Sequence, residues 1–307
     1  MNRLETEGII ELAYKRKSVV PAFNIPYLPM MAPVVQALRD TGTFGLIMVA
    51  RLELFKFEAQ SLEAIRNGYG SVKDELYTRL HLDHVPVIDE DGKRVDYAAL
   101  IREAIDLGYG SVMIDGSRLG LSENIRATRE IVNMGHEAGI PIEAELGAVM
   151  GHEAGPMPPY EELFASGKGF TDPDEAERFV KETDVDWLSV AIGNIHGAVA
   201  PAKKDMKKIE ARLNIAHLDR IRNQVDIPIV LHGGTGIEKS CIMEAIQHGI
   251  AKINIATAIR QPYETALKES VENAQQAVYR TVKELICKEL EITGSISFLS
   301  QDATKNF

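Results

Sequence analysis

One pattern repeats along most of this 307-residue chain: a short apolar stretch rich in β-forming residues, a polar turn, and an amphipathic segment of helical period. The apolar stretches are residues 18–25, 44–50, 78–84, 111–117, 141–147, 187–193, 228–234 and 251–257. Strands that alternate with helices form βαβ units and a parallel sheet. Eight such units without a linker between them predict a single (β/α)8 barrel, with residues 1–307 as one domain.

An open, doubly wound sheet is the other arrangement that such units can adopt. It would place a Gly-x-Gly-x-x-Gly turn after the first strand, but Asn24-Ile25-Pro26-Tyr27 stands there. Extra length falls after the third, fifth and sixth strands, at residues 85–95, 148–170 and 198–212. These are the carboxyl ends of strands, where barrels place their sites. The tail after Tyr263 is predicted to form a long helix to about Leu290, a C-terminal extension of the barrel.

Composition and charge exclude several classes of function. The chain has 34 Lys and Arg against 45 Asp and Glu, a net charge of −11, which argues against binding to the phosphates of nucleic acid. No run approaches the roughly 18 apolar residues of a membrane span, and the first residues lack a signal core. Cys241 and Cys287 have no metal-binding or disulfide spacing. We therefore expect a cytoplasmic protein with a small-molecule ligand and no nucleic-acid or membrane partner.

Side chains that can bind a metal gather at the ends of the predicted strands. They are His81, Asp83 and His84 on the third, Asp115 on the fourth, Glu145 on the fifth, His196 after the sixth and His232 on the seventh. Any one of these histidines alone would be read as a core or loop residue. Several on separate strands, with carboxylates between them at one end of a barrel, predict a metal site. Three imidazoles and an open position are typical of catalytic zinc or a similar divalent ion.

Two further features predict chemistry next to this metal. Asp83 is a candidate acid/base for a substrate hydroxyl, although a carboxylate there could instead orient an imidazole. The turn Gly233-Gly234-Thr235-Gly236 leads into a helix, where backbone amides can approach an anion. Glycine is also required by tight turns in general. Barrels often bind phosphate after strands seven and eight, so we expect a phosphate site here, with Asn254 and Thr257 as further donors.

In this order along the chain, the motifs resemble the class II (metal-dependent) ketose-bisphosphate aldolases, the fructose- and tagatose-bisphosphate aldolase family. The resemblance covers roughly residues 19–266. It depends on Ala22-Phe23-Asn24, His81-Leu82-Asp83-His84, Val112 to Ser117, Glu143-Ala144-Glu145-Leu146-Gly147, Ala191 to Gly197, Leu231 to Gly236, and Lys252 to Thr257.

This resemblance implies roles for individual residues. It implies that His84, His196 and His232 hold a catalytic zinc, and that Asp115 and Glu145 offer it a second position. It implies that Asp83 is the acid/base and that Glu153, after the fifth strand, handles the enediolate proton. It implies substrate and phosphate contacts at Asn24, Gly197, Gly233, Gly234, Thr235, Asn254, Thr257 and Arg260, where the family often holds a monovalent cation as well. A homodimer or homotetramer is also implied.

The sequence departs from the family where the aldehyde half of the substrate is expected. Ala256 stands where fructose-bisphosphate enzymes usually carry Asp, and the loop from Gly197 to Lys203 is longer than the usual Gly-x-x-Lys. Arg51 replaces a small residue after the second strand. A guanidinium there could bind an anionic group of the substrate, or it could form a structural ion pair with Glu53 or a neighbouring carboxylate.

The activity expected from the resemblance is that of a zinc-dependent aldolase. It would cleave a phosphorylated ketose or related sugar derivative through a metal-stabilised enediolate and release dihydroxyacetone phosphate and an aldehyde. A Schiff-base mechanism needs a lysine at the barrel mouth, and we reject it because Lys252 lies at the start of the eighth strand. An epimerase or isomerase that uses the same enediolate is the alternative enzyme. A non-catalytic sugar-phosphate-binding protein would be expected to lack a metal ligand or Asp83.

Overall fold

Eight parallel strands form a closed barrel in a computed structural model that describes residues 5–147, 160–195 and 211–299. Each strand pairs with the next along the chain, and β8 pairs with β1. The strands are β1 Val20–Asn24, β2 Gly45–Ala50, β3 Thr78–Pro86, β4 Ser111–Asp115, β5 Ile142–Leu146, β6 Trp187–Val190, β7 Ile229–Leu231 and β8 Ile250–Ile255. The predicted (β/α)8 barrel is therefore confirmed.

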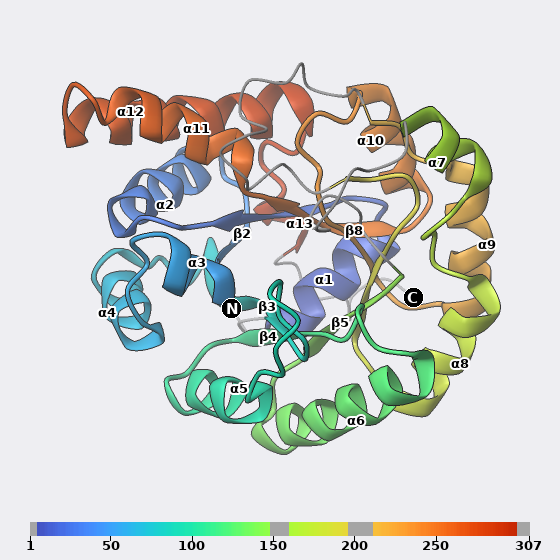
Figure 1. Cartoon of the computed structure of the whole chain (residues 1–307). Helices are drawn as coiled ribbons and strands as arrows, with labels where there is room; N and C mark the ends of the chain where they lie inside the picture. The colour runs from blue at the N-terminus through green and yellow to red at the C-terminus, as the bar shows by residue number, and fades with distance from the viewer. Residues whose placement is uncertain (1–4, 148–159, 196–210, 300–307) are drawn as a thin grey trace.

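Helices surround the strands (Figure 1). They are α1 Thr6–Lys15, α2 Met31–Asp40, α3 Arg51–Lys56, α4 Leu62–Val72, α5 Tyr97–Asp106, α6 Leu121–Ala138, α7 Tyr160–Ser166, α8 Pro173–Thr183, α9 Ile215–Val225, α10 Lys239–Gln247, α11 Thr257–Ala266, α12 Val271–Glu284 and α13 Ile296–Leu299, with shorter turns at Leu28–Met30 and Leu285–Glu289. Among the described residues, none of these helices has the length and apolar character needed to cross a bilayer.

The two faces of each strand have different surroundings, as the two-residue period of a strand requires. On β5, Ile142, Ala144 and Leu146 belong to the large apolar core that the strands share with the helices. Glu143 and Glu145 alternate with them and instead approach His232, which follows β7, across the barrel interior. The barrel interior is thus the place where polar side chains from different strands meet.

The two ends of the barrel differ in polarity. A second apolar cluster joins α1 to the interior of the barrel and includes Ile9, Ile10, Leu12 and Ala13 of α1 with Val20, Leu46, Met48, Trp187 and Val230 of the strands. This cluster fills the amino end of the barrel, from which water is excluded. The polar side chains named above therefore belong to the carboxyl end of the barrel.

The C-terminal extension is helical, as predicted, but it is not one long helix. It is divided after α11, which ends at Ala266, and α12 begins at Val271. The Ser270 side chain accepts a hydrogen bond from the backbone N–H of Asn273 at 3.0 Å. A serine in this extended conformation starts a new helix instead of continuing the old one. In the predicted insertion at residues 85–95, Val85 and Pro86 still belong to β3, and the residues after them form a loop with a bridge between Ile88 and Arg94.

Candidate metal centre

His84 reaches the barrel mouth through an irregularity in β3. The pairing of β3 with β4 shifts between Leu82 and Val85, and His84 has a φ of +28°. A bulge of this kind breaks the strict alternation of side chains along a strand. Ligand atoms of Asp83, His84 and His232 consequently lie within 4.8 Å of one another, although Asp83 and His84 are adjacent in the chain.

Two imidazoles and two carboxylates form the centre of this group. The rings of His84 and His232 lie 4.5 Å apart between centroids, at 70°. His84 Nδ1 is 3.2 Å from Asp115 Oδ2 and 3.8 Å from Glu145 Oε2, while His232 Nδ1 is 3.3 Å from Glu145 Oε2. Nitrogen and carboxylate oxygen atoms at this spacing are a donor set that suits zinc and similar divalent ions.

The electrostatics of the group favour a cation. Burial alone lowers the pKa of His84, but the nearby Asp83, Asp115 and Glu145 outweigh it and raise that pKa to about 10. Burial raises the pKa of Glu145, and the negative charge of Asp115 raises it further. Carboxylates this close cannot all be ionised without a positive charge between them. The residues present therefore fit a bound divalent metal, which would displace the proton on the imidazole.

A buried ion pair lies beneath the metal-binding group. Lys252 Nζ is 2.7 Å from Glu143 Oε2, and both side chains are fully buried. Glu143 Oε1 lies 2.8 Å from His232 Nε2, which leaves Nδ1 as the nitrogen that faces Glu145. A carboxylate on the far nitrogen of a ligating histidine fixes the ring and its tautomer. Because the ammonium already compensates Glu143, we assign no second metal to the deeper group of His81, Asp83 and Glu143.

Asp83 is held at both carboxylate oxygens. Asn24 Nδ2 donates to Oδ2 and Asn254 Nδ2 donates to Oδ1, each at 2.9 Å. Burial alone raises the pKa of Asp83, but the nearby His84, His232 and Lys252 lower it below its usual value. Asp83 is therefore an ionised carboxylate in a fixed orientation beside the metal-binding group, as a base requires.

The glycine-rich turn after β7, predicted to bind phosphate, is tightly packed. Gly233 has a φ of +67°, and a Cβ on Gly234 would lie 2.8 Å from Ile253 Cδ1, so neither position accepts a larger residue without adjustment. Thr235 continues the turn, and Thr257 is the first residue of α11. The backbone amides of a turn and of a helix start are suited to phosphate.

The model of the class-II fructose-bisphosphate aldolase family matches residues 4–296, nearly the whole chain. The chain belongs to this family. It is a class II aldolase, a lyase of a metal-dependent kind, in agreement with the His, Asp and Glu groups described above. The alternative of a non-catalytic binding protein is thereby disfavoured.

Relatives of this aldolase agree in sequence and in fold. It is 40% identical over 217 residues to a protein of Escherichia coli K12 described as uncharacterized protein YdjI, with 69% of this chain and 72% of that protein covered. The X-ray structure of the YdjI aldolase from E. coli K12 matches 95% of this chain and 99% of that one, with a TM-score of 0.73 and 28% identity. A fructose-bisphosphate aldolase from Campylobacter jejuni, at 16% identity and a TM-score of 0.72, matches 95% and 96% and shows the fold alone.

Besides the residues of the turn after β7, Thr257 and Arg51, the residues predicted for this aldolase site fall into three groups. The structure brings together His84, His232, Asp115, Glu145, Asp83, Asn24 and Asn254. Arg260 pairs with Glu264 at 2.8 Å and lies over the Phe57 ring, so a substrate contact for Arg260 stays a prediction. His196, Gly197 and Glu153 lie outside the described residues, and their roles also stay predictions.

Three residues that contact the predicted site residues were not predicted from the sequence as part of the site. Glu143 and Lys252 each lie two residues before a predicted site residue, Glu145 and Asn254, so strand periodicity was a signal that they share its face. Glu53 accepts hydrogen bonds from Asn24 and from the Ala50 backbone. The sequence carried no signal for it, because a capping-box signature needs Ser, Thr, Asp or Asn three residues before the glutamate and Ala50 stands there.

Proposed function

We propose that this aldolase uses zinc, or a similar divalent cation, to cleave a phosphorylated ketose or related sugar derivative into dihydroxyacetone phosphate and an aldehyde. The observation that supports it most is the convergence of His84 and His232 with Asp83 and two further carboxylates at the barrel mouth. We also propose His196 as the third imidazole ligand. A cytoplasmic homodimer or homotetramer, with a monovalent cation near the phosphate, completes the proposal.

The proposed chemistry divides between the metal and two carboxylates. When bound, the divalent cation acts as a Lewis acid on the ketose carbonyl and offsets the negative charge that develops there. Asp83 takes the proton of the C4 hydroxyl, the C3–C4 bond breaks, and C4 becomes the aldehyde carbonyl. The electron pair of that bond passes into the enediolate of the other fragment. Glu153 then supplies the proton that converts the enediolate into dihydroxyacetone phosphate.

The phosphate-binding half of the proposal is supported by the turn after β7. Gly233, Gly234 and Thr235 would surround the phosphate with backbone N–H groups, and Thr257 would add a hydroxyl at the start of α11. Asn254 extends from this side to Asp83. The phosphate would thus hold the substrate so that its C4 hydroxyl lies near Asp83, which is the positioning that such a reaction needs.

A panel of ketose phosphates tests the proposed function. The zinc-loaded enzyme would be given fructose 1,6-bisphosphate, tagatose 1,6-bisphosphate, fructose 1-phosphate and ketose 1-phosphates that end in a carboxylate. We expect at least one to yield dihydroxyacetone phosphate, measured through NADH oxidation by glycerol-3-phosphate dehydrogenase. A product that keeps all the carbon atoms of the substrate would instead identify an epimerase or isomerase.

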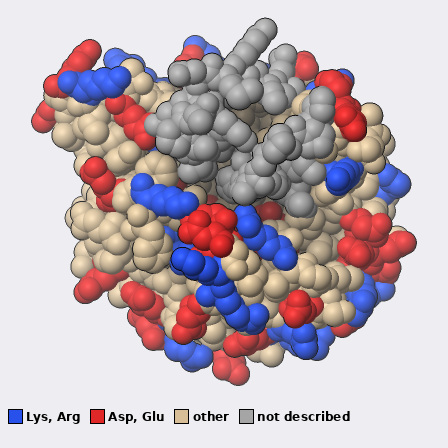
Figure 2. Space-filling view, in the orientation of Figure 1, with Lys and Arg blue, Asp and Glu red and all other residues tan. Residues whose placement is uncertain are grey.

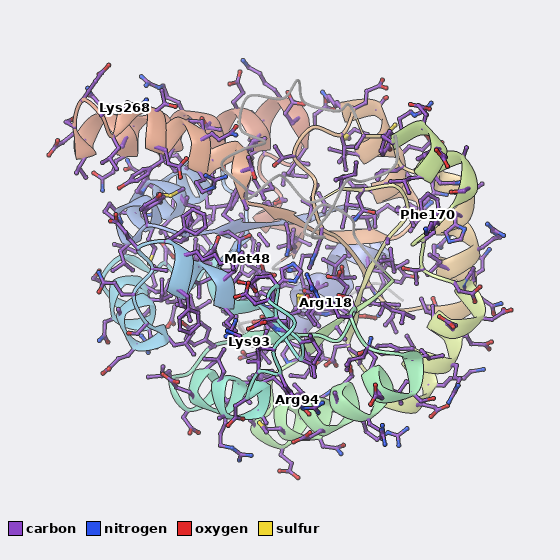
Figure 3. All side chains as sticks on the ribbon, in the orientation of Figure 1. Met48, Lys93, Arg94, Arg118, Phe170 and Lys268 are labelled. Atoms are coloured by element: carbon purple, nitrogen blue, oxygen red, sulfur yellow. The ribbon has the colours of Figure 1, made fainter. Side chains whose placement is uncertain are left out.

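Arg51 gives a prediction about the aldehyde half. Its guanidinium forms a loose ion pair with Asp89, at 3.8 Å from Oδ2. The same guanidinium lies over the Phe55 ring. Figure 2 shows acidic and basic side chains side by side near the middle of this face, the region where Figure 3 labels Lys93 and Arg118. We expect Arg51→Ala to raise KM about tenfold or more for a substrate whose aldehyde half is anionic, because a charge-assisted hydrogen bond is worth about 1.5–3 kcal/mol.

The matched control for Arg51 is Arg126→Ala, which removes the guanidinium of another ion pair, on the outer helix α6. It should leave KM unchanged. The structure favours Asp89 over Glu53 as the structural partner of Arg51. If the wild-type enzyme cleaves fructose 1,6-bisphosphate efficiently and Arg51→Ala leaves that cleavage unchanged, Arg51 has only a structural role.

A further inference from the structure

Glu53 is a buried carboxylate that the proposed reaction does not use. It lies in the first turn of the short helix α3, directly after β2, and is 7% exposed. Its Oε2 accepts a hydrogen bond from the Ala50 backbone N–H at 2.8 Å. Ala50 has no side-chain acceptor of its own, so the glutamate supplies this helix start with its cap. A cap alone does not require the second contact that Glu53 makes.

That second contact leads to Asp83. Asn24 Nδ2 lies 3.3 Å from Glu53 Oε2 and 2.9 Å from Asp83 Oδ2. An amide NH₂ carries two hydrogens, and only the nitrogen end of the amide suits a position between two carboxyl groups. Glu53 therefore fixes the orientation of the Asn24 amide, and in this orientation one N–H points at Asp83.

The opposite side of Asp83 is held in the same manner. Lys252 Nζ donates to Asn254 Oδ1 at 2.6 Å, and Asn254 Nδ2 donates to Asp83 Oδ1 at 2.9 Å. On each side a charged or acidic side chain orients an amide, and that amide holds one oxygen of Asp83. Burial raises the pKa of Glu53 to about 8, and the charge of Asp83 adds to the increase.

We propose that Glu53 is a positioning residue for Asp83 and acts through the amide of Asn24. The inference rests on the proposed function, in which Asp83 is the base for the C4 hydroxyl. Glu53 itself need not touch the substrate. Loss of its acceptor would free the Asn24 amide to rotate and would release one oxygen of Asp83, while the imidazoles would remain in place.

Glu53→Met tests this, because methionine keeps the length and apolar contacts of the side chain without an acceptor. The zinc-loaded enzyme would be assayed for carbon–carbon bond formation between dihydroxyacetone phosphate and D-glyceraldehyde. We expect kcat to fall about 10- to 100-fold, the usual effect of losing a partner behind a functional group, with KM changed less than about threefold. Bound zinc and exchange of the α-proton of dihydroxyacetone phosphate should persist. Glu53→Gln, which keeps the acceptor oxygen, should restore kcat.

A double-mutant cycle separates positioning from capping. In the Asn24→Ala background, Glu53→Met should cause no further loss of kcat, because its effect passes through Asn24. Asp96→Ala, which removes the cap that Asp96 provides to α5, is the matched control and should lower stability without lowering kcat. Glu53→Ala serves as a second variant if methionine packs badly.

Three results would overturn the inference: full kcat in both Glu53→Met and Glu53→Ala, a parallel fall of α-proton exchange, or an undiminished loss in the Asn24→Ala background. The proposed function is tested independently of this inference. If Asp83→Asn cleaves normally, the role of Asp83 is wrong whatever Glu53 does. If Asp83→Asn is inactive while Glu53→Met and Glu53→Ala are both fully active, only the inference about Glu53 is wrong.

Discussion

Replacing His232 by alanine is expected to remove both the bound metal and turnover. His232 is fully buried between Glu143 and Glu145, so no other side chain can take over its position without rearrangement. Even residues behind a metal ligand contribute about 10- to 100-fold in affinity, and loss of the ligand itself should exceed that. Elemental analysis and titration with a zinc chelator measure the loss directly, without reference to activity.

His217→Ala is the matched control for this variant. His217 is also a buried histidine, but it bonds to the backbone oxygen of Thr171 at 2.7 Å and lies outside the metal-binding group. It should keep its zinc and its activity. Full turnover by wild-type enzyme shown to be metal-free by elemental analysis would rule out the metal mechanism.

Asp83→Asn is expected to bind zinc but to cleave its substrate about 10²- to 10⁴-fold more slowly, the contribution of a positioned acid or base. An asparagine also sets an amide NH₂ against one of the two amides that donate to this position, so the contact with Asn24 or Asn254 is lost as well. Asp83→Ala is a second variant without this conflict. The rate at which a ketose phosphate is cleaved into its products checks the prediction, and the zinc content of the variant is measured alongside it.

Proton exchange separates Asp83 from Glu153 in the same experiment. Asp83→Asn should still exchange the α-proton of dihydroxyacetone phosphate with solvent deuterium, because that step is assigned to Glu153. Glu153→Ala should show the opposite pattern, in which α-proton exchange is lost and carbon–carbon bond cleavage is the less affected step. Equal loss of both steps in both variants, at normal zinc content, would contradict this division of labour.

The strands and the end of the barrel that carries the site were predictable because they depend on local period and on strand polarity. Each observed strand overlaps a predicted one; β4, for example, lies at Ser111–Asp115 within the predicted 111–117. Parallel strands bring their carboxyl ends together, so His84 and His232 had to approach once a barrel was assumed. The apolar pattern was therefore sufficient to predict the strands and the end of the barrel that carries the site.

The contacts between strands were not predictable, because they depend on register and on side-chain reach. Lys252 was assigned to the far end of the barrel, but its long side chain extends inward to Glu143 and Asn254. The Schiff-base mechanism was rejected on that assignment, which the structure corrects. What argues against a Schiff base in the structure is that the amine is paired with Glu143. From the sequence, Glu53 was considered only as an ion-pair partner of Arg51. The pairing of β2 with β3, with Ala50 opposite Asp83, places it near the site.

The irregular step in β3 also limits how this chemistry could be moved to another protein. On a strand paired with β4 in regular register, without the shift between Leu82 and Val85, adjacent residues such as Asp83 and His84 would point to opposite faces of the strand. One of the two would leave the mouth and enter the layer beneath the helices. A designer who grafts this base and metal ligand onto a new barrel would have to transfer the distorted segment as one cassette, because two point substitutions on a straight strand cannot reproduce it.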